Sequence, residues 1–112
     1  MIRPDPIRVF LVDDQTLVRQ GIRSLLALAE GIEVVAEAAD GRQAVELIPQ
    51  VKPDVVLMDM RMPAMSGLEA LQAMGRAGTL PPTIILTTFD DDQLVLAGIK
   101  AGAKGYLLTD VS

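Results

Sequence analysis

The chain has 112 residues, the size of one domain, which excludes a two-domain enzyme or a large multi-layer catalytic fold. Ten basic and fifteen acidic residues give a net charge of −5, which disfavours direct binding to nucleic-acid phosphates. The sequence has no cysteine and no histidine, so disulfides, thiolate or imidazole metal sites and most hydrolase triads are excluded.

Five apolar runs rich in β-branched residues recur along the chain and predict strands at 7–12, 33–38, 54–58, 83–88 and 104–109. Between them, stretches of helical period predict helices at 15–29, 41–51, 66–77 and 91–102. In the first helix, one face carries a predicted buried stripe of Leu17, Val18, Ile22, Leu25, Leu26 and Ala29. Pro49 is expected to strain or end the second helix, and Gly78 and Gly102 to terminate the third and fourth.

This alternation of strands and helices favours one fold class. Near-continuous apolar strands joined by helical crossovers are typical of parallel strands covered on both faces. We therefore predict a single α/β domain over 1–112, with a doubly wound, five-stranded parallel sheet.

The chain stops just after the fifth strand, with Asp110 or Ser112 placed as the N-cap of a further helix. Lacking that fifth helix, the domain is expected to expose apolar surface and to dimerise or exchange segments.

Polar residues close several of the predicted strands. In an open α/β sheet the functional crevice lies at the carboxyl ends of the strands, so these residues are expected to meet at one rim. They are Asp13 and Asp14 after the first strand, Asp59 after the third, Thr87 and Thr88 at the fourth, and Thr109 at the fifth. Like charges at such distances repel, and either a bound divalent cation or protonation relieves the repulsion. Oxygen ligands alone favour Mg²⁺ or Mn²⁺.

A carboxylate beside a bound Mg²⁺ is also a nucleophile toward a phosphoryl group. Asp59 stands alone at its strand end and is the predicted acceptor, whereas the paired Asp13 and Asp14 are better placed as metal ligands. Thr87 on the next strand offers a hydroxyl for a phosphoryl oxygen.

Four segments together resemble the receiver domain of bacterial two-component response regulators, most closely the NarL/FixJ type. They are LVDDQ (11–15), DVVLMDMRMPAMSGLEAL (54–71), ILTTFDDD (85–92) and AGAKGYLLTD (101–110), and the similarity covers the whole chain in order and spacing. The resemblance implies a flavodoxin-like sheet with strand order 2-1-3-4-5. It also implies a sensor histidine kinase as partner, self-association as a dimer, and DNA binding only through a C-terminal helix-turn-helix domain outside this sequence.

The resemblance also implies residue roles. Asp59 would be the phosphoacceptor, Asp14 a direct Mg²⁺ ligand and Asp13 a ligand through water, with the main-chain carbonyl of Arg61 as a further ligand. Thr87 matches the switch hydroxyl and Tyr106 the aromatic that follows it. Pro63 and Gly67 match the turn that follows the acceptor. Arg61 and Thr88 match positions that influence how long the phosphoryl group lasts.

One position departs from the family. The lysine that ends the fifth strand in the family, and contacts the phosphoryl group, is matched by Thr109 in this chain. Lys104 does not replace it, because five strand residues place it roughly 16 Å away at the opposite end of the strand. Arg61 is the nearby basic candidate.

Simpler interpretations stay open for several of these residues. Asp13 and Asp14 also suit a helix N-terminus, as do Asp90, Asp91 and Asp92. Tyr106 suits an ordinary core aromatic with its hydroxyl at the surface. The five methionines from Met58 to Met74 suit core or surface filler, and Asp40-Gly41 suits a turn that starts a helix.

The predicted function is a phosphorylation-dependent signalling receiver of a transcriptional regulator. It is not an enzyme in the ordinary sense but assists its own phosphorylation and dephosphorylation. A haloacid-dehalogenase-like phosphatase would need a D-x-D pattern closing the first strand, and a flavodoxin-like flavin carrier a Gly/Ser/Thr-rich loop there. The remaining alternative is a degenerate receiver that acts as a phosphorylation-independent interaction module, which Thr109 favours.

Since the sequence shows no signal peptide and no long apolar run, a cytoplasmic location without a membrane partner is expected.

Overall fold

The computed structural model describes residues 5–87 and 91–109, and within them strands and helices alternate as predicted. The elements are β1 (Ile7–Val12), α1 (Thr16–Ala27), β2 (Ile32–Ala38), α2 (Gly41–Val51), β3 (Val55–Asp59), α3 (Gly67–Ala77), β4 (Thr83–Thr87), α4 (Asp92–Lys100) and β5 (Gly105–Leu108). The bounds differ from the predicted ones by no more than about two residues, which is the usual uncertainty at element ends. Thr88, Asp90, Asp110 and Ser112 lie outside the described residues.

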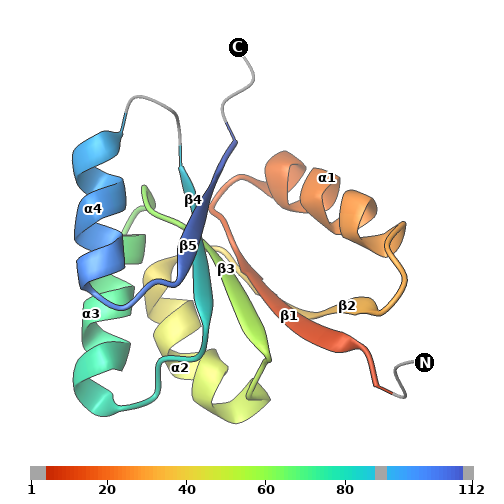
Figure 1. Ribbon diagram of the computed structural model, residues 1–112, viewed down its shortest axis with the longest axis horizontal. Coiled ribbons are helices and arrows are strands. Elements are labelled where there is room, and N and C mark those ends of the chain that lie inside the picture. Colours follow the sequence, from red (N-terminus) through yellow and green to blue (C-terminus); the bar gives the residue numbers. More distant parts are fainter. Residues whose placement is uncertain (1–4, 88–90, 110–112) are drawn as a thin grey trace.

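The five strands form one parallel sheet in the order β2-β1-β3-β4-β5, which confirms the predicted doubly wound topology. Helix α1 covers one face of this sheet, whereas α2, α3 and α4 cover the other (Figure 1). Every crossover connects parallel strands, so the carboxyl ends of all five strands lie at the same edge. None of the helices in 5–87 and 91–109 is long and apolar enough to cross a bilayer.

The core lies on both faces of the central strands. On the face of α2, α3 and α4, Phe10, Met58 and Ile85 are fully buried. On the α1 face, Leu11 and Leu86 are buried beneath Ile22 and Leu26 of that helix. Three of the methionines, Met58, Met60 and Met74, are buried, so their interpretation as packing residues is confirmed.

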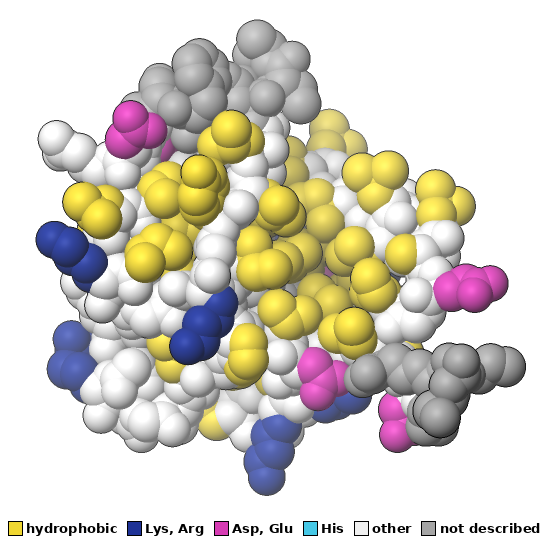
Figure 2. All heavy atoms as spheres, in the orientation of Figure 1, with side chains coloured by type: hydrophobic (Ala, Val, Ile, Leu, Met, Phe, Trp, Pro, Cys, Tyr) yellow, Lys and Arg dark blue, Asp and Glu magenta, His cyan; other side chains and the backbone are white. Residues whose placement is uncertain are grey.

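The predicted buried stripe of α1 is only partly correct. No residue of α1 is fully buried, and the side chains of Leu17 and Leu25 are 81% and 69% exposed. Of the six predicted residues, Ile22 and Leu26 reach the core, because only part of the apolar face of α1 contacts the sheet. Leu107 of β5, which pairs with Leu86 on this same face, is also 51% exposed. Figure 2 shows the hydrophobic side chains gathered between α1 and β5.

Helix ends follow the predicted signals with one exception. Asp40 caps α2 by accepting a hydrogen bond from the Gln43 N–H, and Gly78 and Gly102 follow α3 and α4 with φ of 74° and 118°. Pro49, however, does not end α2, which continues to Val51. A proline this close to the C-terminus removes one bond of the last turn, so the helix is able to continue past it.

Candidate metal and phosphoacceptor site

The predicted acidic residues meet at the carboxyl edge of the sheet. Asp13 follows β1 directly and Asp59 is the last residue of β3, and these two strands are hydrogen-bonded neighbours with Val12 opposite Met58. One carboxylate oxygen from each of Asp13, Asp14 and Asp59 lies within 4.8 Å of the others. The structure therefore brings together the three carboxylates that the sequence predicts as one site.

The backbone holds two of these carboxylates in place. The Asp13 carboxylate accepts a hydrogen bond from the Gln15 N–H at 2.8 Å, and the Asp13 N–H donates to the carbonyl of Ala38 on β2 at 3.1 Å. The Asp59 carboxylate accepts from the Arg61 N–H at 3.3 Å, so the Arg61 backbone lies beside the predicted phosphoacceptor. Whether the Arg61 carbonyl also binds a metal stays a prediction.

The electrostatics of this site favour a bound cation. Burial, followed by repulsion from Asp13, raises the pKa of Asp59 from 3.8 to about 6. The pKa of Asp13 is also raised, again chiefly by burial, against the lowering effect of the Gln15 N–H bond. A positive ion placed among the three carboxylates is therefore expected to stabilise the ionised forms of Asp13 and Asp59.

The donor set fits Mg²⁺ or Mn²⁺. All three ligand atoms are carboxylate oxygens, which these hard cations prefer. Mg²⁺ binds oxygen at about 2.1 Å in an octahedron, so its ligand oxygens lie roughly 3–4 Å apart. The spacing of the cluster is compatible with this geometry when some ligands bind through water.

A small hollow of about 40 Å³ adjoins Asp59. Its lining includes four of the predicted site residues: Asp59 at the end of β3, Arg61 in the loop after it, Thr87 at the end of β4, and Thr109, which directly follows β5. Thr87 is buried, and the Ile85–Tyr106 pairing places Tyr106 on the α4 face of β5. Tyr106 is 52% exposed, so its interpretation as an ordinary core aromatic is wrong; its role as a switch stays a prediction.

Thr109 lies where the family is expected to carry lysine. Its N–H donates to the carbonyl of Thr87 at 2.8 Å, and its hydroxyl donates to the same carbonyl at 3.2 Å. The N–H of Lys104 donates to the carbonyl of Thr83 at the start of β4, which places Lys104 at the opposite edge of the sheet as predicted. Thr109 thus supplies a backbone-bound hydroxyl to the hollow and no positive charge.

The guanidinium of Arg61, the nearby basic candidate, is bonded to an acidic residue. It donates to both carboxylate oxygens of Asp91, with the Nε bond 2.9 Å long, and Asp91 immediately precedes α4. This bidentate pair links the loop after β3 to the start of α4. The expectation that Asp91 and Asp92 open a helix is confirmed, and Asp91 in addition pairs with Arg61.

The raised pKa of Asp59 predicts a pH-dependent stability. The folded domain holds the proton of the Asp59 carboxyl group more tightly than the unfolded chain does. The stability that this protonation contributes is therefore fully present below pH 3.8 and is lost as the pH rises through about 6. The shift corresponds to at most about 3 kcal/mol, and solvent screening at this partly buried group reduces it to about 1–2 kcal/mol. In metal-free buffer at pH 7.5, Asp59→Asn should therefore be more stable than the parent by about that amount.

Urea unfolding at pH 4 and pH 7.5 in the presence of a chelator measures this difference. The gain of Asp59→Asn should nearly vanish at pH 4, and Mg²⁺ at pH 7.5 should stabilise the parent more than the variant. Glu46→Gln removes one exposed carboxylate from α2 and serves as the control. Equal stability of Asp59→Asn and the parent at pH 7.5 would contradict the pKa assignment.

Sequence reasoning missed a polar network beside the acidic site. Arg19 and Arg23 of α1 both pair with Glu37 of β2, and Arg19 also donates to the main-chain carbonyl of Asp13. The available signal was Glu37 near the carboxyl end of a largely apolar strand, together with two arginines of the preceding helix spaced by one helical turn.

This fold and acidic rim define a class of signalling domain, and the comparisons agree. Residues 9–112 match the family model described as the response regulator receiver domain. The chain belongs to this family, whose members are phosphorylation-dependent signalling modules. This membership decides against the phosphatase and flavin-carrier alternatives.

Particular relatives place it among NarL-type regulators. The chain is 50% identical over 105 residues to the nitrate/nitrite response regulator protein NarP of Escherichia coli (strain K12), covering 94% of this chain and 49% of the relative. It is 48% identical over 106 residues to the uncharacterized transcriptional regulatory protein YxjL of Bacillus subtilis (strain 168), covering 95% and 49%. The signal receiver domain of the putative response regulator NarL from Mycobacterium tuberculosis superposes with a TM-score of 0.88 at 36% identity, covering 97% and 88%. The chain spans about half the length of the curated relatives it matches.

Proposed function

We propose that this domain accepts a phosphoryl group from a sensor histidine kinase on Asp59, with Mg²⁺ or Mn²⁺ bound at Asp13, Asp14, Asp59 and the main-chain carbonyl of Arg61. The observation that carries the proposal is the cluster of three carboxylate oxygens within 4.8 Å, beside a hollow lined by Thr87, in a chain of the receiver family. The kinase, the metal and the exact ligand set are parts of this proposal.

Phosphoryl transfer requires the protein mainly to position the reacting groups. A carboxylate oxygen of Asp59 attacks phosphorus, an oxygen–phosphorus bond forms as the bond to the kinase histidine nitrogen breaks, and that nitrogen keeps the electron pair. A divalent cation, when bound, neutralises charge on the transferring oxygens. Thr87, at the end of β4, supplies a hydroxyl that can hydrogen-bond a phosphoryl oxygen.

The output follows from a change in the same edge of the sheet. Movement of Thr87 toward the phosphoryl group frees space for Tyr106 to turn inward, which alters the surface of β5 and with it dimerisation. DNA binding enters through a C-terminal helix-turn-helix domain, consistent with transcriptional regulators among the relatives and with their greater length. A cytoplasmic location stays a prediction.

A second candidate function is a degenerate receiver that signals without phosphorylation. It is favoured by Thr109, whose hydroxyl bonds the Thr87 carbonyl in place of a lysine that would reach the phosphoryl group. The two functions differ in whether Asp59 is modified at all.

Intact mass measurement after incubation with Mg²⁺ and acetyl phosphate tests the proposal. The parent should gain one phosphoryl group, and the gain should vanish in Asp59→Asn and in the presence of a chelator. Asp54→Asn, which changes the residue directly before the same strand, should still be modified as the parent is. A parent that gains no mass would favour the degenerate receiver, and a modified Asp59→Asn would show that another residue is the acceptor.

A further inference from the structure

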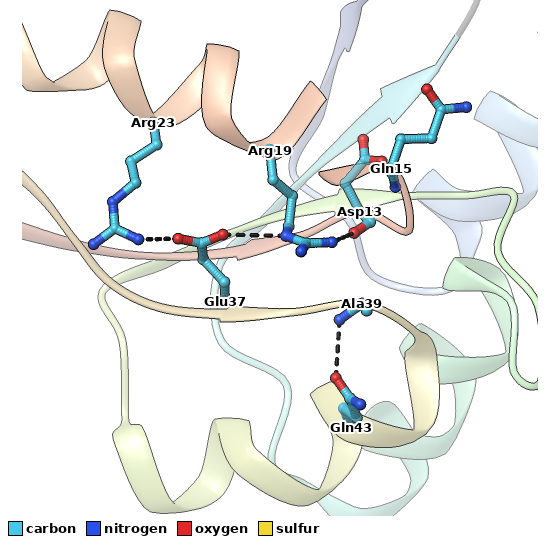
Figure 3. Close-up of polar contacts among 7 residues, drawn as sticks. All are labelled: Asp13, Gln15, Arg19, Arg23, Glu37, Ala39 and Gln43. Atoms are coloured by element: carbon cyan, nitrogen blue, oxygen red, sulfur yellow. Dashed lines mark hydrogen bonds and ion pairs between the residues drawn. The ribbon is translucent and has the colours of Figure 1, made fainter. Parts of the chain in front are cut away.

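Arg19 connects three elements at the acidic rim. From the end of the first turn of α1, its Nη1 donates to the main-chain carbonyl of Asp13 at 2.6 Å and its Nε donates to Glu37 of β2 at 3.1 Å (Figure 3). The Arg19 side chain is 16% exposed and that of Glu37 is 24% exposed, so both contacts are largely shielded from water. Charge-assisted hydrogen bonds of this kind are stronger than neutral ones and fix orientation.

The accepting carbonyl belongs to the peptide that joins Asp13 to Asp14. A hydrogen bond to this oxygen sets the plane of that peptide and therefore the direction in which the chain leaves toward Asp14. The Asp13 carboxylate is held separately by the Gln15 N–H, and its own N–H by Ala38. Arg19 thus supplies the contact that orients the second half of the acidic pair.

Helix α1 has few other anchors. No residue of α1 is fully buried, and Gln15 at its N-cap makes no side-chain capping bond. By contrast, Asp40 caps α2, and Ser66 and Glu69 form a capping box at α3. The start of α1, and with it the loop that carries Asp13 and Asp14, therefore lacks the side-chain caps of α2 and α3 and is held instead by the bonds of Arg19.

Glu37 is built into the sheet at the matching position. It pairs with Leu11 of β1, which lies on the α1 face, so its carboxylate is directed beneath the helix. Arg23 pairs with the second oxygen of Glu37, one helical turn further along α1, but its side chain is 57% exposed. Arg23 shares the anchor with Arg19 but not the contact with the acidic loop.

We propose that Arg19, anchored by Glu37, is a positioning residue for the divalent-cation site, because it fixes the Asp13–Asp14 peptide. This proposal rests on the proposed function, which supplies the cation. A positioning role and the charge of Arg19 predict opposite effects of its removal on Mg²⁺ affinity. Since a guanidinium repels a metal ion, loss of its charge would by itself strengthen Mg²⁺ binding, whereas loss of positioning weakens it.

Isothermal titration of the 112-residue chain with Mg²⁺ tests the proposal. Arg19→Met should weaken Mg²⁺ binding about 10-fold, the loss typical of residues that orient metal ligands. Arg19→Lys keeps the charge but lacks the planar fork that serves both partners, so it should weaken binding almost as much. Arg23→Met removes the neighbouring ion pair with Glu37 and should stay within about twofold of the parent, since the bond to the Asp13 carbonyl comes from Arg19.

Amide NMR spectra of the metal-free proteins provide a readout that does not depend on metal. The Asp14 and Gln15 amides should shift in Arg19→Met and stay near their parental positions in Arg23→Met. Unchanged or tighter Mg²⁺ binding in Arg19→Met, full recovery in Arg19→Lys, or equal losses in Arg19→Met and Arg23→Met would each overturn the proposal. A parent that binds no Mg²⁺ would instead contradict the proposed function, and the amide shifts would then decide about Arg19 separately.

Discussion

Gly67→Ala is expected to destabilise the domain by about 3 kcal/mol and to weaken Mg²⁺ binding. Gly67 is the first residue of α3, and a Cβ placed on it would lie 2.1 Å from the carbonyl oxygen of Asp59 and 2.8 Å from the Cα of Met60. Both neighbours are backbone atoms, so no change of rotamer relieves the overlap. The end of β3 must move, and Asp59 moves with it.

Urea unfolding and Mg²⁺ titration of Gly67→Ala measure the two effects. Gly21→Ala is a matched control, because a Cβ at Gly21 meets nothing within 4 Å and alanine is the better helix former inside α1. That control should be as stable as the parent or gain up to about 1 kcal/mol. If Gly67→Ala unfolds at the same urea concentration as the parent, the close approach of α3 to the end of β3 is not essential.

The sequence predicts most of this fold because its patterns are local. Each strand is an apolar run between turn residues, and each helix carries its own period and termination signals, such as Gly78 after α3. The acidic cluster is also predictable, because parallel strands of a doubly wound sheet all end at the same edge. These two facts place Asp13 beside Asp59 although 45 residues separate them in the chain.

The features that escaped prediction depend on contacts between distant segments. The period of α1 identifies its apolar arc but not how much of that arc the sheet covers, which is why Leu17 and Leu25 are exposed. The partner of Arg61 could not be read from the sequence either, because Asp91 is one of three consecutive aspartates at the start of a helix. The link from Arg19 to Glu37 likewise joins residues whose pairing only the packing of α1 on β2 decides.

Thr109→Lys is expected to accelerate phosphorylation of Asp59 by about 10-fold and to enlarge the conformational response. Thr109 lines the same hollow as Asp59, so a lysine there brings an ammonium group close to the three carboxylates. An ion pair of about 4 Å at an effective dielectric near 20 is worth about 4 kcal/mol before desolvation. About a third of this, expressed in the transition state, gives the tenfold acceleration.

The phosphorylation rate with acetyl phosphate and the phosphate-induced NMR shifts of Thr87 and Tyr106 measure both effects. The control is Thr79→Lys, which adds the same charge at an exposed position at the opposite edge of the sheet. It should leave the rate close to that of the parent, since charges separated by more than a Debye length are screened.

An unchanged rate in Thr109→Lys would leave two explanations, which Arg61 separates. If Arg61 leaves Asp91 and supplies the charge itself, Arg61→Met should slow phosphorylation of the parent, and Thr109→Lys should restore the rate in that variant. If neither substitution changes the rate or the NMR response, a cation at the end of β5 has no part in the reaction, and the switch does not run through Thr87 and Tyr106. In that case the bond from the Thr109 hydroxyl to the Thr87 carbonyl is a purely structural closure of β4 and β5.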